Sequence, residues 1–189
     1  MGLVRLEAPA ALHTLEELQL HLRVDNPEED DRLQALGAAA VEAAEAFTRR
    51  RFVSQKWRLL LDAWPDRAIV LPYAPLVSVE SVKYVDAAGT LQTLATSEYA
   101  VRTTETPGEI VRAYDVSWPD VRTFVDVVRV EFTAGYGVAA AVPAAIRQAV
   151  LLIVGGLYDN PAHIVAGISA AEIPATARSL LGPYCVRRW

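Results

Sequence analysis

Residue types that carry most metal and nucleophile chemistry are sparse in this sequence. It holds three histidines, His13, His21 and His163, and one cysteine, Cys185. A zinc site needs three or four convergent ligands, and His13 and His21, eight positions apart, do not by themselves supply them. We therefore expect no metal site. Cys185, with no histidine partner nearby, is expected to be a small buried or half-buried thiol.

Motifs that position a nucleophile or a phosphate group are also missing. No serine lies in a Gly-x-Ser-x-Gly turn, and the chain has no glycine-rich phosphate-binding loop. Segment 25–31 is acidic like a calcium loop, but Pro27 and the missing glycine break that spacing, and helix capping explains it better. The sequence therefore shows no recognisable catalytic, cofactor or metal site. A hydrolase with an unrecognised Ser/His/Asp set stays an alternative, which histidine-to-alanine changes would test.

Two clusters suggest binding without catalysis. Five basic residues and no acidic residue lie between positions 49 and 58. Such a run at the end of a helix is more often a solvated face than a phosphate site. Trp57, Trp64 and Trp118 are candidates for a sugar-binding platform, although tryptophans on strands more often belong to a core. A carbohydrate-binding β module thus stays open as a second alternative.

Composition indicates one globular domain. The chain has 189 residues, of which 52% are hydrophobic and 22% charged, and its net charge of −5 argues against general nucleic-acid binding. The most apolar run, residues 149–157, is far shorter than the roughly 20 residues that a membrane span needs. A single cysteine and an N-terminus unlike a secretory signal favour a reducing compartment.

Hydrophobic spacing predicts helices at both ends of the chain. They are expected at about residues 14–22, 27–50, 144–158 and 174–181. Asn26 and Pro27 are a capping residue and a proline suited to the first helical position. The apolar stripe of this second helix recurs every three or four positions, at Leu33, Leu36, Ala40, Ala44 and Phe47.

From Val53 the hydrophobic period changes to two, which predicts strands. They are expected near residues 53–63, 68–71, 77–85, 91–94, 99–102, 109–112 and 125–133. Asp86–Gly89 is a predicted hairpin turn, and a change of phase indicates a bulge near Ser81. Because the links are short, the strands should pair antiparallel. The predicted fold class is α+β.

Several short motifs occur in a characteristic order. They are His21-Leu22-Arg23-Val24-Asp25, Arg51-Phe52-Val53-Ser54-Gln55-Lys56-Trp57, Trp118-Pro119, Val130-Glu131-Phe132-Thr133-Ala134-Gly135-Tyr136-Gly137, Val142-Pro143 and Leu157-Tyr158. Together, over about Leu15 to Tyr184, the chain resembles the head–tail connector (adaptor) proteins of long-tailed bacteriophages and of related gene transfer agents. Each motif alone is weak, and their order and spacing make the resemblance specific.

The resemblance implies a structural protein without enzymatic activity or cofactor. Such proteins form a ring, usually of twelve subunits, beneath the portal of a filled capsid, where the ring extends the DNA channel. The implied fold is a small helical bundle made of residues 1–52 and 138–189, with residues 53–137 as an antiparallel β insertion between the long helices.

Partners and location also follow from the resemblance. The implied partners are further copies of the chain, the portal protein, the next tail component and double-stranded DNA in passage, with no membrane. The location would be the neck of a virion or gene-transfer particle assembled in the bacterial cytoplasm. A stopper or tail-terminator role in the same particle is the nearest alternative.

Two surfaces are candidates for these contacts. A channel through which DNA slides should avoid a basic wall, so acidic residues are expected to line it: Glu28, Glu29, Asp30 and Asp31. The apolar C-terminal stretch with a basic tip is expected to dock on the portal, through Ile173, Pro174, Leu180, Leu181, Pro183, Tyr184, Arg187, Arg188 and Trp189. The alternative for this stretch is a helix packed on its own bundle.

Overall fold

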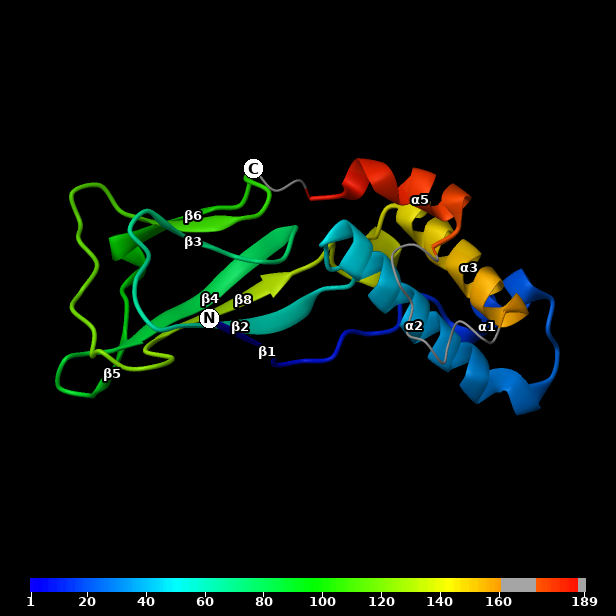
Figure 1. Ribbon diagram of the computed structural model, residues 1–189, viewed down its shortest axis with the longest axis horizontal. Helices are drawn as coiled ribbons and strands as arrows, with labels where there is room; N and C mark the ends of the chain where they lie inside the picture. Colours follow the sequence, from blue (N-terminus) through cyan, green and yellow to red (C-terminus); the bar gives the residue numbers. More distant parts are fainter. Residues whose placement is uncertain (161–172, 187–189) are drawn as a thin grey trace. The chain divides into compact units, whose positions relative to one another are not determined.

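A computed structural model of the chain describes residues 1–160 and 173–186 and divides into two compact units. We call them the sheet unit, Met1–Pro9 with Ser54–Gly135, and the helical unit, Ala10–Val53 with Tyr136–Trp189. The helices of one unit and the strands of the other are labelled in Figure 1. The α+β class expected from the sequence is confirmed.

The helical unit contains four described α-helices, at the places that the sequence predicts. They are α1 (Leu15–Leu22), α2 (Asp30–Thr48), α3 (Ala144–Asp159) and α5 (Ala175–Leu181), with short 3-10 turns η1 (Pro27–Glu29), η3 (Ala139–Ala141) and η4 (Gly182–Tyr184). Thr14 caps α1 through a reciprocal capping box with Glu17. The second helix begins later than expected, because residues 27–29 form a 3-10 turn, in which the Glu28 N–H donates to the Asn26 side chain.

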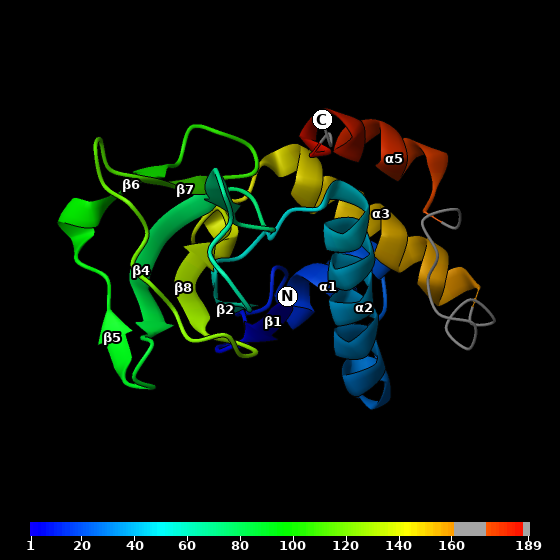
Figure 2. The ribbon, with the colours of Figure 1, turned by 60° about the vertical axis from the view of Figure 1, so that its left-hand side comes forward.

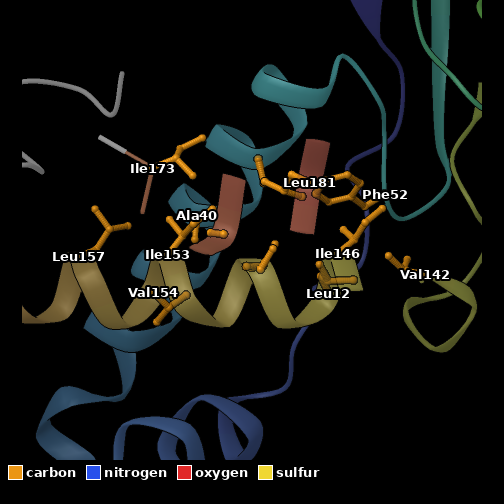
Figure 3. Close-up of a cluster of buried hydrophobic side chains, with 14 of the residues drawn as sticks. Leu12, Ala40, Phe52, Val142, Ile146, Ile153, Val154, Leu157, Ile173 and Leu181 are labelled. Carbon is orange, nitrogen blue, oxygen red and sulfur yellow. The ribbon is translucent and has the colours of Figure 1, made fainter. Parts of the chain in front are cut away.

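The core of the helical unit lies between α2, α3 and α5. Ile146, Ile153 and Leu157 point from α3 toward the side on which Ala40, Ile173 and Leu181 lie (Figure 3). The predicted stripe of α2 is confirmed, since Leu33, Leu36, Ala40 and Ala44 are buried and Phe47 is partly buried. Alanine at the α2 contact positions lets α3 approach closely.

The sheet unit consists of two antiparallel sheets that share one core. The five-stranded sheet has the order β1 (Gly2–Arg5), β2 (Gln55–Leu61), β8 (Val128–Ala134), β4 (Leu76–Val85) and β5 (Leu91–Thr93). The three-stranded sheet has the order β3 (Ala68–Val70), β7 (Glu109–Arg112) and β6 (Tyr99–Arg102). Strands β4 and β8 curve side by side (Figure 2). Leu59 and Val130 from one sheet meet Ile69 and Ile110 from the other in a buried cluster.

Local turn chemistry follows the prediction, and the strand ends differ from it. Gly89 closes the turn after Asp86 with a φ of 91°, which favours glycine, and the pairing of β4 with β8 is irregular between Val79 and Ser81. The last strand was expected from residue 125, but β8 begins only at Val128, and Phe124 and Val125 are 67% and 61% exposed. Strand β1 was not predicted, and it places the first residues of the chain in the sheet unit.

Candidate interaction surfaces

The described residues hold no constellation typical of a metal or thiol site. Among residues 1–160 and 173–186, no group of three or more His, Cys, Asp or Glu side chains is placed to hold a metal ion. Burial raises the pKa of the Cys185 thiol, whose Sγ lies 3.8 Å from the Phe47 carbonyl oxygen. The thiol is half-buried, as expected, and its raised pKa leaves little reactive thiolate at neutral pH. None of the helices in the described part of the chain is long and apolar enough to span a bilayer.

A polar cluster joins α1 to the first turns of α3. The ring nitrogens of buried His13 lie 2.8 Å from Glu17 Oε2 and 3.1 Å from the Arg147 carbonyl oxygen, and the Arg147 guanidinium donates to Glu17 Oε1 over 2.7 Å. Burial alone would raise the pKa of Glu17, but the His13 hydrogen bond and the Arg147 charge outweigh it and lower that pKa. The adjoining pocket of about 450 Å³ is lined by His13 and by residues of α1 and α3, and the hydrogen bonds of the cluster connect these two helices.

Only half of the predicted acidic surface is free of internal partners. Glu29 accepts from Arg32 at 3.3 Å, and its hydrogen bond to the Tyr158 hydroxyl raises the pKa of that tyrosine. Asp30 accepts from the Gln19 amide at 2.7 Å, which ties α1 to α2. Glu28 and Asp31 are exposed, and neither forms an ion pair within the described residues. These two carboxylates are thus the part of the cluster available to face a channel.

Most of the basic side chains between positions 49 and 58 have partners within the protein. Arg50 Nε donates to the Tyr184 carbonyl at 2.6 Å, and Arg51 pairs with Glu45 at 2.8 Å. The remaining pairs join Lys56 to Glu7 at 2.9 Å and Arg58 to Glu131 at 2.6 Å. Because four of the five basic side chains already have such partners, this run is not a phosphate-binding surface.

The three tryptophans of the sheet unit do not form an open platform. Trp57 is buried and contacts the Tyr73 ring at a centroid distance of 4.6 Å. Trp64 and Trp118 stack on each other at 4.6 Å with 7° between their planes. Each indole N–H donates to a backbone carbonyl beside the other ring, that of Pro119 or Pro65. Since two of the flat faces cover each other, these residues support the sheet unit and leave no coplanar sugar-binding pair.

The C-terminal candidates divide into packed and exposed residues. Ile173 and Leu181 are fully buried in the helical core, with Leu180 and Tyr184 packed against it. Pro174 is half-buried and Pro183 is exposed. The Val186 N–H donates to the Thr48 carbonyl at 3.0 Å, which holds the segment against the end of α2. Arg187, Arg188 and Trp189 lie outside the described residues.

The face of the five-stranded sheet that points away from its core carries a surface that sequence analysis missed. Val128 and Val130 are fully buried, so Arg129 between them points to this opposite face. Its direct cross-strand partner on β4 is Lys83. Forty-six positions separate the two residues in the chain, and only the strand register, which the sequence does not reveal, brings them together.

A family comparison agrees with the motifs and the fold. A model described as "Phage gp6-like head-tail connector protein" matches residues 12–109, just over half of the chain. The chain belongs to this family. The family consists of structural connectors, so the protein is a connector and not an enzyme, as the sequence resemblance implied. No curated protein matches it significantly.

Solved structures match the connector over its whole length. A chain in the neck of an empty gene transfer agent particle, computed with C6 symmetry, has 26% identity and a TM-score of 0.82. A chain from the virion of a native gene transfer agent particle has 27% identity and a TM-score of 0.82, and one from a native neck computed with C12 symmetry has 27% and 0.79. Each match covers 100% of this chain and 97% of the other.

Proposed function

We propose that this connector forms a closed, twelve-membered ring between the portal and the tail in the neck of a phage-like gene transfer particle. The observation that carries the proposal is the match along the whole chain to neck proteins, one of them from a neck computed with C12 symmetry. A closed ring is built from repeated head-to-tail contacts. Each contact can be weak, because ring closure makes the contacts multivalent and raises the overall affinity. The ring extends the DNA channel and receives the next tail component.

Charge placement supports a channel wall along which DNA slides. Glu28 and Asp31 are exposed and without ion-pair partners among the described residues, while most of basic segment 49–58 is paired internally. DNA binds where clustered cations release counterions from its phosphates, so an acidic, cation-poor wall repels it. We assign Glu28 and Asp31 to the bore of the ring, and Glu29 and Asp30 to the bundle that holds them.

Portal docking is assigned to the end of the chain beyond the packed helix. Ile173 and Leu181 belong to the subunit's own core, so they stabilise α5 and are not free to enter another protein. After them come Pro183, which is exposed, and Tyr184, which is half-buried. The basic tip Arg187–Trp189 ends the chain segment. The docking contact therefore consists of these last residues, with α5 as their support.

A short truncation tests the docking assignment. Deleting Arg187–Trp189 removes two positive charges and an aromatic ring and leaves α5 in place, so the melting temperature should stay unchanged while attachment to DNA-filled heads is lost. The matched control replaces the same three residues with Ser-Gly-Ser, which should fail in the same way. Normal attachment of either variant would contradict the assignment.

Particle microscopy tests the ring itself. Cells without the gene should accumulate DNA-filled heads that lack tails, and particles with the gene should show twelve copies of the chain directly below the portal. A position farther along the neck, with another ring between it and the portal, would instead favour the stopper or tail-terminator role. Fully tailed, infectious or gene-transferring particles made without the gene would refute the proposed function.

A further inference from the structure

One row of residues crosses the five-stranded sheet with two adjacent positive charges. The row contains, in strand order, Gly2, Leu60, Arg129, Lys83 and Thr93. Arg129 and Lys83 stand directly opposite each other and both are half-buried. Within the described part of the chain neither forms an ion pair, and the Arg129 Nε donates only to the Asp126 carbonyl at 3.3 Å.

A parallel row on the same face shows how the sheet usually places charge. There Arg58 stands opposite Glu131, and their side chains pair at 2.6 Å. Nearby, Lys56 pairs with Glu7, and Glu80 accepts hydrogen bonds from Thr133 and Ser78 at 2.6 and 2.7 Å. Lys56 and Arg58 are therefore neutralised within the subunit. Lys83 and Arg129, on the same face, have no such acidic partner among the described residues.

Like charges directly across two strands repel, because their Cβ atoms lie only about 5 Å apart. A carboxylate placed above the pair would relieve this repulsion and accept charge-assisted hydrogen bonds from both side chains. We propose that Lys83 and Arg129 bind an acidic segment of another protein of the neck. This inference rests on the proposed function, because that function surrounds the connector with other neck proteins.

The surrounding charges favour a polypeptide over DNA. Within the described part of the chain, the pairing of Lys56 with Glu7 and of Arg58 with Glu131 leaves no continuous row of free cations for the evenly charged backbone of a duplex to follow. Two cations also neutralise too few phosphates for stable binding at physiological salt. A single carboxylate, in contrast, would accept charge-assisted hydrogen bonds from both cations at once. We assign the carboxylate to a different neck protein, and crosslinking from the same face distinguishes that protein from a second copy of the connector.

A single substitution tests separately the repulsion between Lys83 and Arg129 and their binding of a partner. Lys83→Glu places a carboxylate opposite Arg129, as Glu131 stands opposite Arg58. The melting temperature of the free connector should therefore rise, while attachment of the next neck component to connector-bearing heads should fall about tenfold. The control is Lys56→Gln, which removes a cation from the same face but leaves the Lys83–Arg129 pair, and it should retain normal attachment.

Binding probes identify the class of partner. Hexaglutamate peptide should bind the free wild-type chain and the Lys56→Gln variant equally, and the Lys83→Glu variant about tenfold more weakly. Tighter binding of a 20-base-pair DNA duplex than of hexaglutamate would overturn the assignment to a polypeptide. A photo-crosslinker at exposed Thr93 should link the connector to a different neck protein, and a link to a second copy of the connector would also overturn it.

Failure of this inference is distinct from failure of the proposed function. Normal particles from the Lys83→Glu variant, in cells where deleting the gene blocks tail attachment, would refute the acidic-segment site and leave the connector role intact. A melting temperature that falls on the Lys83→Glu change would refute the premise that the two cations repel. Normal particles after deletion of the gene would refute the connector role itself.

Discussion

The helical unit and the sheet unit use their polar residues differently. In the helical unit, Glu45, Asp30 and Glu17 accept hydrogen bonds from neighbouring elements and hold the helices together. In the sheet unit, Lys83 and Arg129 form no ion pair among the described residues, and Tyr114 and Phe124 of the loop between β7 and β8 are 100% and 67% exposed. The helical unit thus uses these carboxylates to connect its helices, whereas the sheet unit keeps two adjacent cations without an ion pair among the described residues.

Truncating the largest buried rings should have the largest effect in both units. Phe52 of the helical unit and Phe132 of the sheet unit are fully buried, so each change to alanine should cost about 3–5 kcal/mol of unfolding free energy. Urea unfolding followed by circular dichroism measures both losses. If the units unfold separately, each variant should shift one transition only. A loss below about 1 kcal/mol in either variant would contradict the packing described for that unit.

Neutralising a buried carboxylate should have the next largest effect, confined to the helical unit. Glu45 Oε1 accepts the Phe52 N–H at 2.7 Å, and its Oε2 pairs with Arg51 at 2.8 Å. Glu45→Gln removes the charge from this buried network and should cost about 1.5–3 kcal/mol. Glu42→Gln, an exposed change on the same helix, is the control and should leave the unfolding free energy nearly unchanged. Equal stability of the two variants would show that Glu45 does not hold the end of α2.

The smallest expected effect depends on pH. The folded state lowers the pKa of Glu17, so its carboxylate contributes stability above the ordinary carboxyl pKa, and that contribution disappears as pH falls through the lowered value. Glu17→Gln should therefore reduce stability at pH 7 by less than about 1 kcal/mol, since the side chain is partly exposed. The difference between variant and wild type should shrink as pH falls below the ordinary carboxyl range and through the lowered pKa of Glu17. Denaturant titrations at several pH values test this, and a constant difference across pH would contradict the assignment.

Local rules predicted the helical unit well because its determinants lie close together in sequence. The Thr14 cap lies three residues from Glu17, and the stripe of α2 repeats within one helix. The hairpin at Asp86–Gly89 and the bulge near Ser81 were also predicted from neighbouring residues. The connector resemblance followed from the order of such local motifs, and the family match confirms it.

Contacts between distant segments account for what the sequence did not reveal. The sequence does not show the partners of basic residues 49–58, because Lys56, Arg58 and Arg50 meet residues 49, 73 and 134 positions away. Strand β1 is defined by its pairing with β2, where Leu3 stands opposite Leu59. The Lys83–Arg129 pair likewise depends on strand register. Each of these features requires the three-dimensional pairing, which hydrophobic period alone leaves undetermined.

The tryptophan distribution gives the two units separate optical signatures. Trp57, Trp64 and Trp118 all belong to the sheet unit, and the helical unit contains no tryptophan among its described residues. In a Trp189→Phe background, indole fluorescence would therefore report the sheet unit alone, while ellipticity at helical wavelengths would follow mainly the other unit. Binding of a partner to the sheet unit during neck assembly could thus be followed by indole fluorescence, with no dye attached.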